Sequence, residues 1–170
     1  MLKNIRIDIN NLSTIDSAIK ELEEYRDSLG GKLDDIVDEL RHEGEIYAKN
    51  QVQEMDNWGT LDELVNSITS DHDGKASAKI YPTIYWAKYV EFGTGLKGLS
   101  HSHPLPPGNW GYSAKSWWYP AKPDTPNPKT MMFPWGFYAW TSGMPSRPFM
   151  WNTATWLYIR KSEVIREFFK

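Results

Sequence analysis

The side chains best suited to acid–base chemistry in this chain are two carboxylates in a long stretch with no other acid. Glu91 and Asp124 are the only acidic residues between Asp73 and Glu163. Two carboxyl groups that face one cleft can hydrolyse a glycosidic bond, and tryptophans, of which the chain has nine, often stack on sugars. Because nothing in the sequence sets the distance between the two groups, a carbohydrate-binding or cell-wall-degrading protein is the less favoured interpretation.

Two short polar runs resemble metal sites but lack the remaining ligands. His101-Ser102-His103 could supply two ligands, yet a zinc site needs three or four and the chain has four histidines and no cysteine. We therefore predict exposed loop histidines there. Asp71-His72-Asp73-Gly74 lacks the downstream acids of a calcium loop. It predicts instead the turn of a β-hairpin with strands near 64–70 and 75–81.

Other catalytic patterns are missing from the sequence. Gly93-Thr94-Gly95 lacks the following Lys-Ser/Thr of a phosphate-binding loop. No serine nucleophile elbow stands out, and the absence of cysteine excludes thiolate nucleophiles and disulfides. We therefore predict a protein that is not an enzyme, with no catalytic residue, no cofactor and no metal.

The charge of the chain is unevenly distributed. Residues 1–74 hold 18 acids and 7 bases (−11), and residues 75–170 hold 4 acids and 12 bases (+8), which sum to the net charge of −3. The plain interpretation is an acidic helical surface; the sharper one is a pair of complementary faces that could register head-to-tail subunit contacts. The pI of about 5.8 and the lack of a basic cluster beyond Arg160-Lys161 disfavour sequence-specific DNA binding.

The length of 170 residues predicts one domain, spanning residues 1–170. No apolar run reaches the roughly 18 residues of a membrane span, and the first residues lack the apolar core of a signal peptide. We therefore expect no membrane association, and a protein that stays in the cytosol until it is assembled into something larger.

The N-terminal third is predominantly helical in pattern. Alternating isoleucines over residues 5–9 predict a short strand. Apolar residues spaced by three, four or seven then predict a helix near 14–29 and a longer helix near 32–55, broken at Gly30-Gly31. Because the apolar stripe keeps its phase across the glycines, one bent helix is the alternative, and a coiled coil is disfavoured because the repeat is short and imperfect.

The next elements follow from turn and capping signals. Asn57-Trp58-Gly59-Thr60 predicts a turn, and Thr60 with Glu63 has the spacing of a capping box. The aromatic segment 84–91 fits a short helix or a strand. Arg147-Pro148 predicts the start of a C-terminal helix, because proline is tolerated in a first helical turn.

A long loop is predicted over residues 93–148, which hold 10 of the 11 prolines and 7 of the 12 glycines. Its aromatic side chains either pack into a small second cluster on their own domain or anchor contacts between subunits, where tryptophan and tyrosine are enriched. The candidate interface residues in this loop are Trp110, Trp117, Trp118, Trp135 and Trp140.

Two segments on either side of this loop resemble signatures of one family. The run from Tyr85 to Gly95, Tyr-Trp-Ala-Lys-Tyr-Val-Glu-Phe-Gly-Thr-Gly, is similar to the "Tyr-Ala-x-Tyr-Val-Glu-Phe-Gly-Thr" signature of siphophage neck and tail-completion proteins. Met144 to Met150 resembles the "Pro-Ala-Arg-Pro-Phe-Leu" signature that opens their C-terminal helix. A third motif, from Asn57 to Ile68, matches only loosely, since it lacks the proline and its glycine precedes Thr60.

The resemblance, which covers roughly residues 12–170, implies an α+β fold with N-terminal helices, a small antiparallel β-sheet, a long Trp/Pro-rich loop and a C-terminal helix. It implies a non-enzymatic virion protein that forms a homo-oligomeric ring, six-fold or twelve-fold, in the neck between head and tail. The implied partners are head-closure or adaptor rings, tail-tube proteins and tail-terminator proteins, with genome DNA passing through non-specifically. A tail terminator or minor tail protein is the alternative.

Within the two signatures we expect structural or interface roles. Glu91 lacks a catalytic partner in the sequence, and we expect it to act as a clasp that pairs with Arg147 and joins the signatures. Glycines 93 and 95 allow a sharp turn after the aromatic segment. The remaining candidates are Tyr89, Phe92, Pro148 and Phe149.

Overall fold

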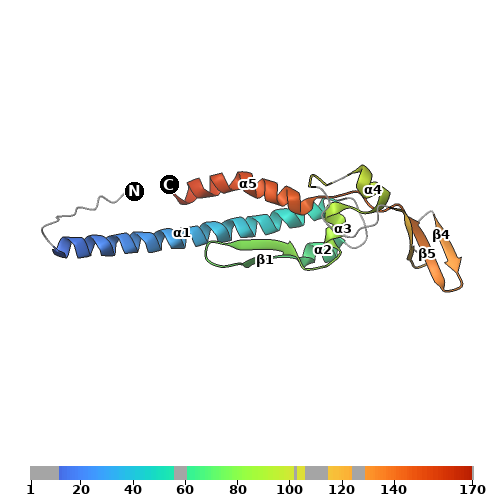
Figure 1. Cartoon of the computed structure of the whole chain (residues 1–170), viewed down its shortest axis with the longest axis horizontal. Helices are drawn as coiled ribbons and strands as arrows, with labels where there is room; N and C mark the ends of the chain where they lie inside the picture. The colour runs from blue at the N-terminus through green and yellow to red at the C-terminus, as the bar shows by residue number, and fades with distance from the viewer. Residues whose placement is uncertain (1–11, 56–60, 102, 106–114, 124–128, 170) are drawn as a thin grey trace.

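One helix, α1 (Leu12–Gln53), runs along most of the length of the molecule (Figure 1). The structure is a computed structural model that describes residues 12–55, 61–101, 103–105, 115–123 and 129–169. α1 continues through Gly30 and Gly31, so the predicted break is wrong and the alternative of one helix is correct. A Cβ atom added at either glycine would meet no atom within 4 Å. The cost of about 2 kcal/mol for this exposed pair is offset by packing farther along the helix.

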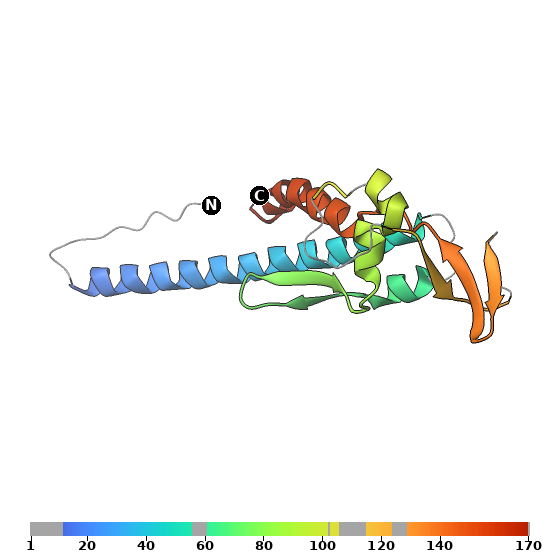
Figure 2. The same ribbon diagram turned by 45° about the vertical axis from the view of Figure 1, so that its right-hand side comes forward.

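The C-terminal helix α5 (Phe149–Phe168) lies antiparallel against the second half of α1 (Figures 1 and 2). Its start confirms the prediction made from Arg147-Pro148. Three contacts hold the two helices in register, each one turn farther along α5 and one turn back along α1. They are Asn152 Nδ2 donating to Gln51 Oε1 at 3.1 Å, the stacked rings of Trp156 and Tyr47 with centroids 4.6 Å apart, and Arg160 bound to both carboxylate oxygens of Glu43 at 2.9 and 2.8 Å.

A short helix and a hairpin pack on α1 away from α5. The helix α2 (Leu61–Ser67) leads into β1 (Ile68–His72), which pairs antiparallel with β2 (Ala78–Pro82). The hairpin predicted around Gly74 is therefore confirmed, with its first strand beginning later than expected because α2 occupies the preceding residues. Gly44 lies where these layers meet, since a Cβ added there would lie 2.5 Å from Ile80 Cδ1 and 2.9 Å from Leu157 Cδ1.

The apolar core sits at the end of α1, where α2, β1 and the start of α5 converge with α3 (Ala87–Phe92). The segment 84–91 is thus a turn and a helix rather than a strand. Phe149, the first residue of α5, is the largest of the fully buried side chains. The buried apolar residues of this core are Ala48, Val52, Leu64, Ile68, Ala87, Val90 and Phe149.

The stretch 93–148 is not the irregular loop predicted from its prolines. It contains α4 (Gly95–Ser100) and a three-stranded antiparallel sheet of order β3-β5-β4. The strands are β3 (Trp117–Pro120), β4 (Thr130–Phe133) and β5 (Gly136–Thr141). Proline excludes a long helix but is compatible with strand ends and turns: Pro120 ends β3, and Pro134 lies in the turn after β4.

The three-stranded sheet projects at the end of the molecule opposite the start of α1 (Figures 1 and 2). Helices with small antiparallel sheets give an α+β fold, as predicted. The expected strand at 5–9, the turn at 57–60 and Trp110 lie outside the described residues. Within the described part of the chain, no helix is both long enough and apolar enough to span a lipid bilayer.

Candidate functional site

The two signature segments run side by side, although about 50 residues separate them in sequence. One is the end of α3 with the turn into α4, and the other leads from β5 into α5. Backbone amides on both segments donate across the gap, so the chain crosses itself here. The bonds are Thr94 N to Met144 O at 2.9 Å, Lys97 N to Ser142 O at 3.1 Å, Ser146 N to His101 O at 3.2 Å and Arg147 N to Val90 O at 2.9 Å.

Three buried glycines make this crossing possible. Gly93, Gly95 and Gly143 have φ angles of +73°, +63° and +90°, a region that side chains other than glycine rarely adopt. A Cβ added at Gly143 would overlap the carbonyl oxygen of Thr94, and one at Gly93 would lie 2.6 Å from the backbone nitrogen of Ser146. The sequence prediction of a sharp turn at glycines 93 and 95 agrees with this geometry, but it missed Gly143.

Glu91 links the two segments through its side chain. Its Oε2 accepts the amide of Met150 at 2.9 Å, and its Oε1 accepts the amide of Trp151 at 2.9 Å. These amides are at the second and third positions of α5, where a capping side chain normally binds. Pro148 occupies the cap position and makes no side-chain bond. Glu91 of α3 therefore caps α5 from a distant part of the sequence, and its negative charge favours the helix N-terminus.

His103 completes the surroundings of the Glu91 carboxylate. Its Nε2 lies 3.0 Å from Glu91 Oε1, and its Nδ1 accepts the amide of Leu105 at 2.9 Å. Because Nδ1 is the acceptor, we assign the proton to Nε2, which donates to Glu91. The imidazole lies between the rings of Phe92 and Trp151, with centroid distances of 4.5 and 5.9 Å. The prediction of exposed loop histidines holds for His101 but is wrong for His103, which is buried.

The predicted ion pair between Glu91 and Arg147 is wrong. Among the described residues, the partners of the Glu91 carboxylate are His103 and the two α5 amides. Arg147 joins the same junction through its backbone, which donates to Val90, and the Ser146 hydroxyl donates to the carbonyl oxygen of Glu91 at 2.6 Å. The two signatures therefore meet as expected, but through helix capping and backbone bonds.

The other signature residues surround this junction. Phe149 fills the core, whereas Tyr89 and Phe92 are half-buried on the last turn of α3. The Tyr89 ring lies under the Lys88 ammonium, 5.2 Å from its centroid. Each of these candidates has a packing role in the structure.

The aromatic candidates of the sheet form a cluster of their own. Trp118 and Trp140 are partners in the pairing of β3 with β5, with ring centroids 5.2 Å apart. Phe133 contacts Trp118, Trp135 and Tyr138. Trp117 lies against the backbone near Gly95, where an added Cβ would lie 2.9 Å from its ring. The sheet thus satisfies the first interpretation, a second cluster on the same domain, while Trp135 stays largely exposed.

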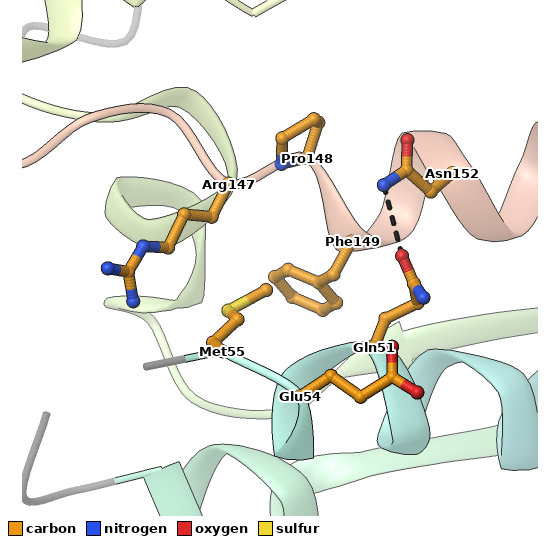
Figure 3. A pocket seen from close by; sticks show the side chains of 7 residues that line it. All are labelled: Gln51, Glu54, Met55, Arg147, Pro148, Phe149 and Asn152. Atoms are coloured by element: carbon orange, nitrogen blue, oxygen red, sulfur yellow. Dashed lines mark hydrogen bonds between the residues drawn. The ribbon is translucent and has the colours of Figure 1, made fainter. Parts of the chain in front are cut away.

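A depression of about 260 Å³ lies at the start of α5 beside the end of α1 (Figure 3). Arg147 and Phe149 line it with Met55 and Glu54, and the two amide side chains at its edge, Asn152 and Gln51, bond to each other (Figure 3). Among the described residues that line it, Glu54 is the one acid and Arg147 the one base, and the amide pair already uses Asn152 Nδ2 and Gln51 Oε1.

The buried polar side chains of this junction already have hydrogen-bond partners. All three donors that reach Glu91 are in place, and no buried side-chain nitrogen or oxygen in the described part of the chain lacks a partner. The same residues contain no group of three His, Asp or Glu side chains that could hold a metal ion. Comparison with protein-family models, curated proteins and solved structures found no match to this chain.

Proposed function

We propose that this chain is a non-enzymatic structural protein of a tailed bacteriophage, which forms an oligomeric ring in the neck and joins head to tail. The observation that carries the proposal is the crossing of the two signature segments. Residues whose sequence resembles the neck-protein signatures are the residues that lock α3, α4 and α5 together. The motifs therefore have a mechanical purpose in this fold, which is what an assembly protein requires.

The hydrogen bonds that occupy both carboxylate oxygens of Glu91 support the same proposal. A general acid or base must exchange a proton with a substrate, but the Glu91 oxygens are engaged by α5 and by His103. Glu91 therefore holds the shape of the junction and is not free to exchange a proton with a substrate. This favours assembly over the alternative of a cell-wall-degrading protein in which Glu91 is the catalytic acid.

The surface supports assembly through its exposed apolar side chains. Large hydrophobic residues are exposed along α1, along the outer side of α5 and on the three-stranded sheet. Surfaces of this kind mark contacts with other proteins. The partners we propose are further copies of this chain, a head-closure or adaptor ring, and tail-tube or tail-terminator proteins, in the virion and, before assembly, in the host cytoplasm.

The test is a deletion of the gene in the phage that carries it. We expect filled heads and complete tails to accumulate separately, and joined particles to return when the wild-type chain is supplied from a plasmid. Tails of abnormal length would instead indicate a tail terminator. Joined, infectious particles without the protein would overturn the proposal.

A matched pair of variants separates folding from contact in the same assay. Glu91→Ala should fail to complement because the junction opens, whereas Glu163→Ala, on the exposed side of α5, should complement normally. If Trp135→Ala loses glycan binding while head–tail joining is unaffected, the carbohydrate alternative gains at the expense of the proposal.

A further inference from the structure

The first half of α1 presents an apolar face that α5 does not cover. α5 ends beside Lys32, whose ammonium donates to the Phe168 carbonyl at 3.4 Å. From residue 16 to residue 28, every α1 residue except Ala18 is exposed. Ile19 and Leu22 are each 51% exposed, and Tyr25 is exposed beside them. Spacings of three residues place these side chains on one side of the helix; we name Ile19, Leu22 and Tyr25 the helix patch.

A second apolar surface lies at the opposite end of the molecule (Figure 1). In the described sheet, β4 is an edge strand that pairs with β5 on one side. Met131 on this strand is 49% exposed, and Trp135 in the following turn is 72% exposed. Trp135 stacks on Phe133, which lies on the same face of the strand as Met131, whereas Met132 points to the opposite face. Tryptophan and methionine are enriched at the centres of protein interfaces. We name Met131 and Trp135 the sheet patch.

The charges around the two patches have opposite signs. Residues 12–31 of α1 carry five acids and two bases, which gives −3. Residues 115–143 carry three lysines and one acid, which gives +2. Two helix patches facing each other would bring like charges together, as would two sheet patches. A helix patch facing a sheet patch combines apolar contact with attraction between the surrounding charges.

We infer that the helix patch of one copy of this chain docks on the sheet patch of another copy. The partner is a second copy because α1, about 60 Å long at 1.5 Å per residue, holds the two patches apart within one molecule. A contact between different surfaces is heterologous, and its repetition closes a ring when the rotation between copies allows. This inference rests on the proposed function for the assembly in which the contact forms.

The charged residues that border the two patches allow the contact to be weakened and restored by charge reversal. Glu21 is four residues before Tyr25, and Glu23 is four residues after Ile19, so helical spacing places one acid on each side of the helix patch. Lys129 immediately precedes β4, and Lys122 follows β3. Reversal of either pair of charges should oppose docking, and reversal of both pairs in one chain should restore it.

The natural chain has no cysteine, so a disulfide between two introduced cysteines can detect the contact without interference from native thiols. The test uses the full-length Leu22→Cys/Met131→Cys variant under mild oxidation. We expect a ladder of covalent oligomers on a non-reducing gel. The control Leu22→Cys/Tyr85→Cys uses a more exposed partner, Tyr85 at 77%, that belongs to neither patch, and it should stay monomeric. Leu22→Cys alone should also stay monomeric.

Charge variants then test the specificity of the ladder. Glu21→Lys/Glu23→Lys or Lys122→Glu/Lys129→Glu should each reduce the cross-linked fraction about tenfold, since each charge pair at an exposed contact is worth up to about 1 kcal/mol. The four substitutions together should restore it. Unfolding midpoints near that of the wild type would show that the variants are folded.

The outcomes separate this inference from the proposed function. Oligomeric rings in native mass spectra without a Leu22–Met131 cross-link would overturn the inference and leave the proposed function standing. A ladder equal to that of the Tyr85 control, or efficient dimers from Leu22→Cys alone, would also overturn it. A specific ladder in a chain whose gene deletion leaves head–tail joining intact would support the contact and remove the neck role.

Discussion

Oε1 of Glu91 lies 3.0 Å from Nε2 of His103, in a pair whose side chains are 9% and 2% exposed. The glutamate lies in the last turn of α3 and caps α5, while the histidine lies in the segment that follows α4. One buried hydrogen bond therefore connects α3 and the start of α5 to the segment after α4, and its loss should be felt by all three.

Removal of the Glu91 side chain should destabilise the whole fold. Glu91→Ala removes the acceptor of the buried His103 N–H and of two part-buried α5 amides, at about 1–3 kcal/mol for each group left unsatisfied. We expect a loss of at least about 3 kcal/mol in the free energy of unfolding by urea titration. The control Glu163→Ala removes an exposed carboxylate from α5 and should change it by about 0.5 kcal/mol or less.

A double-mutant cycle should identify the true partner of Glu91. Coupling between Glu91→Ala and His103→Ala should be about 1 kcal/mol or more, because the two side chains share one hydrogen bond. The cycle of Glu91→Ala with Arg147→Ala should give a smaller coupling, since Arg147 contributes its backbone to the junction. A larger coupling in the Arg147 cycle would contradict the geometry of the cap.

Glycines in different settings should respond in opposite directions to alanine. Gly31→Ala should stabilise the protein by about 1 kcal/mol, because the site is helical, open and exposed. Gly143→Ala should cost about 3 kcal/mol or more, since its φ is +90° and its Cβ would overlap Thr94. Urea midpoints of the two variants that move in the same direction would disprove this assignment.

The contact between α1 and α5 should weaken in acid. Hydrogen bonds from the Arg160 guanidinium lower the pKa of Glu43 below its ordinary value of 4.5. A lowered pKa in the folded state gives stability that is present above pH 4.5 and is lost as the pH falls through the folded value. The difference in unfolding free energy between wild type and Glu43→Gln should therefore shrink from pH 7 toward pH 3.

The Arg160→Met variant provides the control for this pH dependence. Without the guanidinium, the largest cause of the lowered pKa is gone, so Glu43→Gln should produce a much smaller pH-dependent difference in that background. A pH-dependent difference of the same size with and without Arg160 would attribute the lowered pKa of Glu43 to another group, such as the charge of the neighbouring His42.

Features governed by local chemistry were predictable from the sequence. The apolar spacing and Arg147-Pro148 predicted α5, and Asp73-Gly74 predicted the hairpin turn. The helix break at Gly30-Gly31 was wrong because glycine propensity is a weak local cost, which the packing of the second half of α1 outweighs. The apolar stripe that kept its phase across the two glycines was the signal for one helix.

Features governed by distant contacts were not predictable in detail. A sequence does not show which side chain accepts a hydrogen bond from a given backbone amide. The capping of α5 by Glu91 could therefore not be predicted, and the cationic Arg147 was chosen as its partner. The burial of His103 depends on Phe92 and Trp151, which approach only in the folded chain. The three short strands did leave a signal, since Pro134-Trp135-Gly136 separates two apolar runs, but the proline content of the region obscured it.

The crossing of the two segments has an evolutionary consequence. The Lys97 amide donates to the Ser142 carbonyl oxygen, so the chain between these residues begins and ends at the same place beside the helical body. Lengthening such a connection costs little, about 0.6 kcal/mol for each doubling of its length. Mutation can therefore extend, shorten or resurface the sheet without disturbing α1 and α5, and descendants of this protein can change what they attach to while inheriting the same frame.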